Sequence, residues 1–384
     1  MGGPLEGILV LDLSRVLAGP FCTMLLADLG ARVVKVEHPD GGDVTRGWGP
    51  PYHEESGIAA YFLSVNRNKE SIALDLATEG GRRSVEILAR PADVLVENFA
   101  PGRLERFGLS LPELRRANPR LVTASITGFG RRGPDAPSPG FDLLAQAGAG
   151  IMAATGEPEG EPTKVGVAVS DLFAGCYAAV GIAAALRERE RSGRGTHVET
   201  SLFQATLASL INVAQSALLT EEEARRHGNA HPQIVPYRTF RAGDGEFVLA
   251  VGTDPQFARL CDVVGRPAWR DDPRFRANRD RVVHRRELER ELQEILKERP
   301  RSEWLERLRA AGIPAGPVRG PLEALRSEAA RATGAVRRAA GVDFVASPIA
   351  LDGYEPPLSF PPTLDADGDR LRDEFGLPPK SGRA

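Results

Sequence analysis

Short runs of branched apolar residues alternate with helix-like segments through the first half of the chain, and this alternation limits the possible folds more than any other feature. The runs occupy residues 8–13, 31–37, 71–76 and 93–98, and a fifth begins at Leu121. Strands of this kind, separated by single helices, are typical of a doubly wound parallel sheet. The sequence therefore predicts an α/β fold with a large Rossmann-like domain whose ligands bind at the carboxyl ends of the strands. No G-x-G-x-x-G follows any run, so the fingerprint of dinucleotide binding is missing.

The pattern changes after about residue 220. Two apolar segments flank a GDGE turn and predict a β-hairpin, and helix-like segments follow at residues 255–265 and 285–299. A Gly/Pro-rich hinge is expected at 310–318, and the tail carries EPPLSFPPTL, which must run in extended form before a final short helix. We expect a large domain from residues 1–205 and 320–384, a small α+β domain from 225–318, and a connecting helix or linker at 206–224.

Charge and cysteine content exclude several classes of protein. The chain carries 49 Lys and Arg against 52 Asp and Glu, and its formal net charge of −3 lacks the basic excess of a nucleic-acid-binding protein. Its three cysteines, Cys22, Cys176 and Cys261, lie far apart and fit neither a metal site nor a disulfide framework. The longest weakly polar run, residues 172–186, is too short to span a membrane. We therefore expect a soluble, cytoplasmic protein with no metal site, no membrane partner and no nucleic-acid partner.

Lysine is scarce among the basic residues. Only five of the 49 are lysines, namely Lys35, Lys69, Lys164, Lys297 and Lys380. The arginine excess is typical of a GC-rich genome and says little about function. Against that background, each retained lysine is a candidate for a specific role.

One carboxylate stands out, that of Asp171 in the segment SDLFAGCYAAVG. It follows an apolar run at 165–169 that is expected to be a strand, and it opens a helix of small residues. Asp171, or Ser170 beside it, fits a simple N-cap. The same position also keeps a carboxylate ionised and surrounds it with free backbone N–H groups, which suits a nucleophile that attacks an activated acyl group. The small residues let another backbone or a large ligand approach closely.

A series of motifs resembles the CoA-transferase family III, the CaiB/BaiF-like proteins of the formyl-CoA transferase superfamily. No single motif is decisive, but their order along the chain is specific, and the resemblance is strong up to about residue 205 and looser beyond it. The motifs are RVLAGP, KVE with GDVTRGWGP, NRNKES, VENFAPG followed by Arg106, NPRLVTASITGFG, FDLLAQAGAGIMAATG, and the Asp171 helix with its RSGRG end.

The resemblance implies a reaction and its nucleophile. Asp171 would attack an acyl-CoA thioester to give an acyl–aspartyl anhydride, and the CoA thiolate would then form an aspartyl-CoA thioester that a small carboxylic acid takes over. No cofactor would be bound permanently, since CoA and acyl-CoA are the substrates. Two copies of the chain would interlock as a homodimer, with the active site between domains.

The resemblance also implies contacts to the substrates. Positions matching CoA-contacting segments are Val16, Ala18, His38, Asn66, Lys69, Asn98, Phe99 and Arg106, and those expected around the acid are Leu17, Phe141 and Asp142. A cation at Lys69 would suit the phosphates of CoA.

Three positions depart from the pattern of relatives. His38 and Pro139 stand where some relatives have arginine and lysine, which weakens two phosphate contacts. Leu17 stands where oxalate-using members have glutamine, so we expect an acid other than oxalate and a more apolar pocket.

Two other functions stay open at this point. An α-methylacyl-CoA racemase of the same superfamily needs two bases and has a histidine directly before the aspartate of the FDLLAQ segment. Here Phe141 occupies that position, so one base is absent. A non-catalytic CoA-binding protein would be expected to lack the nucleophile, whereas Asp171 is present.

Overall fold

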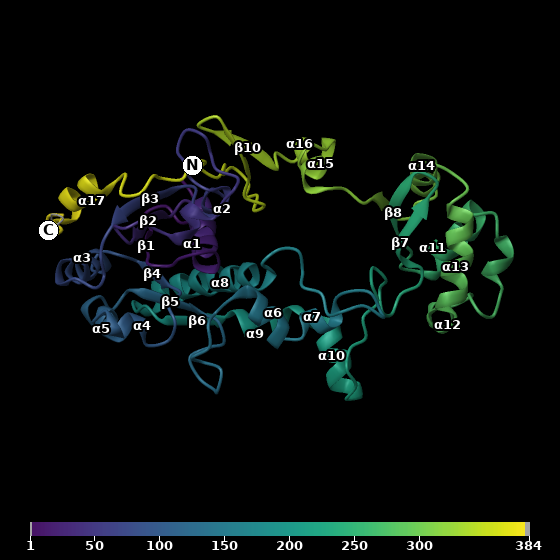
Figure 1. Ribbon diagram of the computed structural model, residues 1–384, viewed down its shortest axis with the longest axis horizontal. Helices are drawn as coiled ribbons and strands as arrows, with labels where there is room; N and C mark the ends of the chain where they lie inside the picture. Colours follow the sequence, from purple (N-terminus) through teal and green to yellow (C-terminus); the bar gives the residue numbers. More distant parts are fainter. Residues whose placement is uncertain (1, 381–384) are drawn as a thin grey trace. The chain divides into compact units, whose positions relative to one another are not determined.

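The computed structural model describes residues 2–380, and this part of the chain divides into two compact units (Figure 1). The first unit contains the residues up to Met152, Lys164–Glu222 and the chain from Glu328 onward. The second contains Ala153–Thr163 and Glu223–Ser327. The segment expected to connect two domains, residues 206–224, lies almost wholly in the first unit.

A six-stranded parallel sheet forms the centre of the first unit, in the order β3-β2-β1-β4-β5-β6. The order reverses between β1 and β4, and ligands of open α/β sheets bind in the crevice at such a reversal. The predicted doubly wound parallel sheet is therefore confirmed. Its strands are β1 (Leu9–Asp12), β2 (Arg32–Glu37), β3 (Lys69–Ala73), β4 (Val94–Glu97), β5 (Val122–Thr127) and β6 (His197–Ser201).

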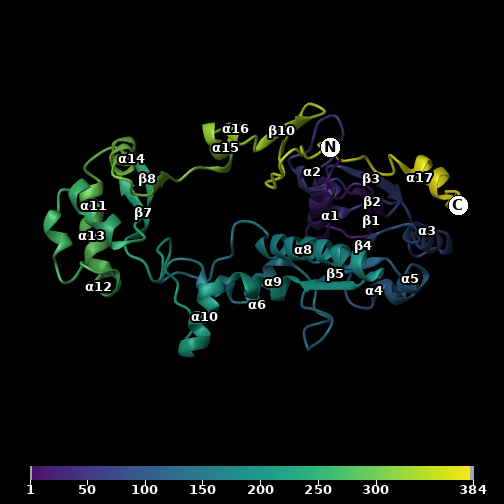
Figure 2. The same ribbon diagram turned by 180° about the vertical axis from the view of Figure 1, so that it is seen from behind.

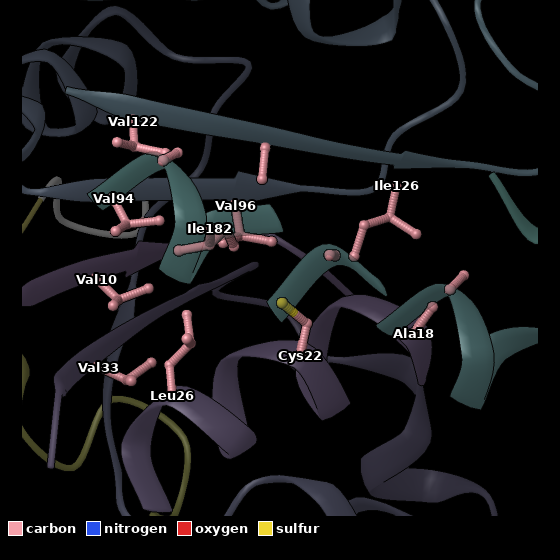
Figure 3. Packing of buried hydrophobic residues seen from close by; sticks show 14 of the residues in the cluster. Val10, Ala18, Cys22, Leu26, Val33, Val94, Val96, Val122, Ile126 and Ile182 are labelled. Atoms are coloured by element: carbon pink, nitrogen blue, oxygen red, sulfur yellow. The ribbon is translucent and has the colours of Figure 1, made fainter. Parts of the chain in front are cut away.

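Helices cover both faces of this sheet. Alternate strand residues point to opposite faces, so Val10 packs in one core and Leu11 in the other. Figure 3 shows the first core, where strand valines face Cys22 and Leu26 of α1 and Ile182 of α8. The helices and short helical turns of this unit are α1 (Ala18–Asp28), η1 (Val44–Gly47), α2 (Ala60–Val65), α3 (Glu79–Ala89), α4 (Arg103–Arg106), α5 (Leu111–Ala117), α6 (Asp142–Gly148), α8 (Val169–Ser192), α9 (Leu202–Ser209), α10 (Ile211–Thr220), α16 (Glu328–Ala332) and α17 (Gly368–Phe375).

Helix α8 differs from its prediction at its start. It begins at Val169, and the strand expected at 165–169 does not form. The Val165 N–H donates instead to the side-chain oxygen of Gln146, so this segment is tied to α6 rather than to the sheet. With 24 residues, α8 is also long and apolar enough to cross a membrane by length and composition. It packs against α1, β5 and β6, and 39% of its most apolar stretch is buried.

The tail of the chain returns to the edge of the sheet. Helix α17 lies beside β3 (Figures 1 and 2). The carboxylates of Asp367 and Asp365 accept the backbone N–H groups of Ser71 and Ala73 at 2.9 and 2.8 Å. These bonds satisfy donors that the edge strand would otherwise expose. A hairpin of β10 (Val336–Ala339) and β11 (Val342–Val345) precedes the tail.

The second unit is built on a three-stranded antiparallel sheet. Strands β7 (Tyr237–Ala242) and β8 (Gly245–Ala250) form the predicted hairpin, and β9 (Ala315–Pro317) pairs with β8. The segment expected to be a hinge therefore contributes a short strand. The unit's helical elements are α7 (Ile151–Ala154), which straddles the boundary, α11 (Asp254–Val263), η2 (Pro267–Arg270), α12 (Asn278–Val283), α13 (Arg285–Leu296), α14 (Arg301–Ala310) and α15 (Pro321–Leu325).

Candidate active site

The loop of residues 14–18 leaves the carboxyl end of β1 and enters α1. We refer to it as the 14–18 loop. Its conformation is unusual, because Val16 has φ = 68° in the left-handed region, which a β-branched residue rarely adopts. Such strain costs on the order of 1–3 kcal/mol and persists only where the surroundings impose it. Helix α1 starts at Ala18, directly after Val16 and Leu17.

A buried cluster of charges lies under this loop. Lys35 of β2 donates to the Ser14 carbonyl at 2.8 Å and pairs with Asp43 at 3.1 Å. Burial is the largest single influence and lowers the pKa of Lys35, but Asp43, Asp12 and Glu37 together raise that pKa above its ordinary value. The Asp43 carboxylate accepts the N–H of Val16 at 3.1 Å. The cluster thus fixes two backbone groups of the strained loop.

Asp12 and Lys69 form a second buried pair, with 3.1 Å between their charged atoms and no exposed side-chain surface on either. Asp12 also accepts the N–H of Ser14 at 2.9 Å. Burial tends to raise the pKa of Asp12, yet Lys69 and Lys35 lower it to about 2. Burial lowers the pKa of Lys69 to about 8, with Asp12 opposing that shift. This pair holds the start of the same loop.

Asn98, which follows β4, joins the loop across the reversal of strand order. Its side-chain oxygen accepts the N–H of Arg15 at 2.8 Å, and its side-chain nitrogen donates to the Arg15 carbonyl at 2.7 Å. The guanidinium of Arg15 lies 5.4 Å from the ring centre of Phe99. Loops after β1 and β4 are therefore bound to each other where a ligand is expected.

Asp171 lies in the first turn of α8 and faces the start of α1. The backbone N–H of Ala18 lies near its carboxylate and lowers the pKa of that group. The two helices approach closely one turn further on, because a Cβ built on Gly175 would lie 2.7 Å from the Ala18 carbonyl oxygen. The small residues of α8 thus permit this approach, as the sequence suggested. Asp171 is not the N-cap, since the helix begins two residues before it.

A second carboxylate, that of Asp142, lies at the same helix start. It accepts the N–H of Ser170 at 2.8 Å and a side-chain N–H of Gln146 at 2.7 Å. Burial, and then the nearby charge of Asp142, raise the pKa of Asp171 to about 7, although the Ala18 N–H lowers it. The expectation that the helix start keeps Asp171 fully ionised therefore needs correction. Desolvation outweighs the helix terminus, and about half of the carboxyl is ionised at neutral pH.

A cavity of about 460 Å³ opens beside Asp171. The ring of Tyr61 meets that of Trp48 edge to face, with 5.4 Å between centroids. Burial, and then the two aspartates, raise the pKa of Tyr61 to about 12, so its hydroxyl stays a donor at neutral pH. The cavity is lined by Arg15, Val16, Trp48, Tyr61, Asn98, Gly140, Phe141, Asp142, Leu143, Lys164, Gly166, Val167, Ala168 and Asp171.

A second cavity of about 290 Å³ lies at the carboxyl ends of β1, β2 and β4. Arg15 borders both cavities. Arg103 and His38 add two further basic side chains, and Phe99 and Phe107 provide aromatic surface. Arginines bind phosphates and aromatic rings stack on bases, and the carboxylates of Glu37, Asp43 and Asp75 line the same cavity.

Four of the eight predicted CoA contacts line one of the two cavities. Val16 and Asn98 line the larger cavity, and His38 and Phe99 line the smaller one. Ala18 is buried, and its backbone N–H lies near the carboxylate of Asp171.

Three other positions do not border either cavity. Lys69 has no exposed side-chain surface, and its ammonium donates to Asp12, Asn66 and the Pro20 carbonyl at 2.9–3.1 Å. A direct phosphate contact by Lys69 or by the equally buried Asn66 does not fit this geometry, so we assign both to the support of the loop. Arg106 is exposed in α4.

Of the three residues expected around the acid, two line the larger cavity and one does not. Phe141 and Asp142 line the larger cavity, with Phe141 largely exposed. Leu17 is buried with Met24 and Val65 instead.

Sequence reasoning overlooked several lining residues, chiefly Arg15, Trp48, Tyr61, Arg103 and Lys164. Arg15 and Trp48 lie inside the quoted motifs RVLAGP and GDVTRGWGP, and Lys164 was one of the scarce lysines. Those signals were present in the sequence and could have been used.

Comparison with known proteins decides the family. The sequence model described as CoA-transferase family III matches residues 5–368. The chain belongs to this family. An acetyl-CoA:oxalate CoA-transferase of Acetobacter aceti is 43% identical over 379 residues, which cover 98% of this chain and 97% of that protein.

A mouse succinyl-CoA:glutarate CoA-transferase is 44% identical over 315 residues, 82% of this chain and 72% of the relative. The crystal structure of a CaiB/BaiF family protein from Brucella suis superposes with a TM-score of 0.89 at 41% identity. That match covers 98% of this chain and all of the other. The resemblance seen in the sequence is therefore confirmed.

Proposed function

We propose that this member of the family transfers CoA from an acyl-CoA thioester to a carboxylic acid through covalent intermediates on Asp171. The observation that carries the proposal is the environment of this carboxylate. The carboxylate lines a cavity, and the backbone N–H of Ala18 lies near it. Its pKa is raised to about 7. A more basic carboxylate is a stronger nucleophile than a solvated aspartate, and it is still half ionised at neutral pH.

The chemistry balances without any further reactant. The Asp171 carboxylate attacks the thioester carbonyl, and the CoA thiolate leaves as an acyl–aspartyl anhydride forms. The thiolate then attacks the aspartyl carbonyl, which releases the donor acid and leaves an aspartyl-CoA thioester. The acceptor carboxylate attacks that thioester to form a second anhydride, and the thiolate finally attacks the acceptor's carbonyl and frees Asp171. The Ala18 N–H supports the negative oxygen that forms on the aspartyl carbonyl when the thiolate or the acceptor attacks it.

We propose a small dicarboxylic acid as the acceptor. The two relatives described above are named for oxalate and glutarate, which are both dicarboxylic acids. The cavity beside Asp171 offers Arg15 and Lys164 as cations for a second carboxylate. All five lysines lie within the described residues, and four of them pair with a carboxylate. The fifth, Lys164, has no such partner among these residues, and its ammonium donates to the Val165 carbonyl at 3.3 Å.

The residue at position 17 speaks against oxalate, whereas a relative named for oxalate speaks for it. Leu17 predicted an acid other than oxalate, yet Leu17 lies in a buried cluster rather than in the cavity lining. The relative named for oxalate is 43% identical to this chain. We therefore keep both oxalate and longer dicarboxylates within the proposal.

A racemase function is the second candidate, and the cavity argues against it. Phe141 lies at the cavity wall where the racemases have a histidine, and no histidine is among the lining residues. The second base is therefore missing.

We also propose that two copies of the chain form a homodimer in the cytoplasm. CoA and acyl-CoA are its substrates, and no cofactor is bound permanently.

One experiment separates these functions. The protein is incubated with succinyl-CoA and glutarate in deuterium oxide, and the products are followed by mass spectrometry. We expect glutaryl-CoA to form without deuterium at the α-carbon, and Asp171→Ala to form none. Deuterium incorporation without transfer, or full transfer by Asp171→Ala, would overturn the proposal.

A further inference from the structure

Every residue of the 14–18 loop except Leu17 has a backbone group held by a side chain. Ser14 is held by Asp12 and Lys35, and Val16 by Asp43. Arg15 is the one loop residue whose N–H and carbonyl both bond to the same side chain, that of Asn98. The loop ends at Ala18, whose N–H reaches Asp171.

Asn98 also packs against the beginning of α1. A Cβ built on Gly19 would lie 2.2 Å from the Ser14 Cβ and 3.5 Å from the side-chain amide carbon of Asn98. The first turn of α1, the loop and Asn98 therefore share one tightly packed corner. A shift of Asn98 would move the amide that faces Asp171.

The bonds to Arg15 also fix the plane of the Asn98 amide. The oxygen is directed to an N–H and the nitrogen to a carbonyl, so the group cannot rotate by half a turn without placing like atoms against each other. A side chain committed in this way is suited to hold a backbone in place. Direct binding of CoA, which the family resemblance implies for this position, would compete for the same atoms.

We propose that Asn98 is a positioning residue, which locks the strained 14–18 loop so that the Ala18 N–H stays on the carboxylate of Asp171. This inference rests on the proposed function, because it assigns Asn98 to the covalent steps at Asp171. It predicts that Asn98 controls turnover and not CoA affinity. Arg15, which borders both cavities, is aligned by the same two bonds.

The test compares Asn98→Ala with a matched control, Asn118→Ala. Asn118 makes the same kind of bonds, from its amide nitrogen to the carbonyls of Ala89 and Ala92 at 3.1 and 2.8 Å, and it borders neither cavity. Transfer from succinyl-CoA to glutarate gives kcat, and equilibrium dialysis with CoA alone gives Kd. Circular dichroism melts show that each variant is folded, and Asn98→Ser replaces Asn98→Ala if the latter is not.

For Asn98→Ala we expect kcat to fall at least tenfold while the Kd for CoA changes less than twofold. The midpoint of the pH profile should also rise, because Asp171 loses part of its contact with the Ala18 N–H. Asn118→Ala should leave kcat, the Kd for CoA and the midpoint of the pH profile unchanged. A tenfold weaker Kd with unchanged kcat would show a direct CoA contact instead, and an unchanged kcat and Kd would show a merely structural role. Either result would overturn the inference.

Asp171→Ala, measured in the same assay, keeps the two proposals apart. If it transfers CoA normally, the proposed function itself fails. If it is inactive while Asn98→Ala turns over at the full rate, only the positioning role fails.

Discussion

Replacement of Asp142 by asparagine should shift the ionisation of Asp171 to lower pH. Burial and then Asp142 raise the pKa of Asp171 from 3.8 to about 7. Because burial is the larger cause, we assign to Asp142 on the order of one pKa unit, or about 1.4 kcal/mol. The asparagine oxygen can still accept the N–H of Ser170, so the start of α8 is retained.

The lower pKa of Asp171 predicts that the variant is faster than the unchanged protein at low pH and slower at high pH. With a pKa near 6 in place of 7, the ionised fraction at pH 6 rises from about a tenth to about a half. The first acyl transfer becomes faster by at most about fivefold, because the weaker basicity of the carboxylate offsets part of this gain. At pH 8 both proteins are ionised, and the variant is slower because a weaker base is a weaker nucleophile. The variant thus gains activity in acid and loses it in base.

The assay is a single turnover without acceptor acid. Enzyme in excess over acyl-CoA is quenched at intervals between pH 5.5 and 8.5, and the released CoA is measured by chromatography. Asp135→Asn, at an exposed position in the loop before α6, is the matched control and should leave the midpoint unchanged. An unchanged or raised midpoint in Asp142→Asn would refute the account of how Asp171 is tuned.

Three further predictions concern the same site. Asp171→Asn should raise the free energy of unfolding by a few kcal/mol at pH 8 but hardly at pH 4. The reason is that a carboxyl with a raised pKa in the folded state costs stability as the pH increases from about 4 through 7, and asparagine removes this cost. Equal effects in urea melts at the two pH values would contradict this. Lys164→Gln should lower kcat/KM for glutarate about fivefold, or ~1 kcal/mol, and leave butyrate unaffected, whereas equal losses for both acids would refute the role of Lys164. Gly175→Ala would place a Cβ 2.7 Å from the Ala18 carbonyl oxygen, so it should destabilise the fold by about 1–3 kcal/mol and reduce kcat about a hundredfold. Gly80→Ala has open space at its Cβ and should do neither.

The central sheet could be predicted because its signal is local. Each strand is a short apolar run followed by a turn, and the five runs noted in the sequence correspond to β1 to β5 within a few residues. The strand expected before Asp171 is wrong for a nonlocal reason. Its Val165 N–H is taken by Gln146 of α6, a contact that no periodicity reveals.

The candidate site was predictable in part. The family motifs led to Asp171, Asp142 and Asn98, all of which lie around one cavity. The surroundings of Lys69 were beyond sequence reasoning, because the sequence around a lysine does not tell whether its ammonium faces a phosphate or a buried carboxylate. Only packing shows that Asp12 is its partner.

The pKa of Asp171 was misjudged for a related reason. The helix start was visible in the sequence, whereas desolvation and the approach of Asp142 depend on how α6 and α8 meet. Electrostatic tuning of a site is a property of the assembled fold.

The most direct test of the central claim is to trap the intermediate. The enzyme is incubated with succinyl-CoA in the absence of acceptor, quenched in acid and digested, and the peptides are analysed by mass spectrometry. We expect the peptide that contains Asp171 to gain the mass of CoA less one water, and the adduct to disappear when glutarate is added before quenching. Transfer without an adduct, or an adduct on the exposed Cys176 of the same helix, would contradict the account.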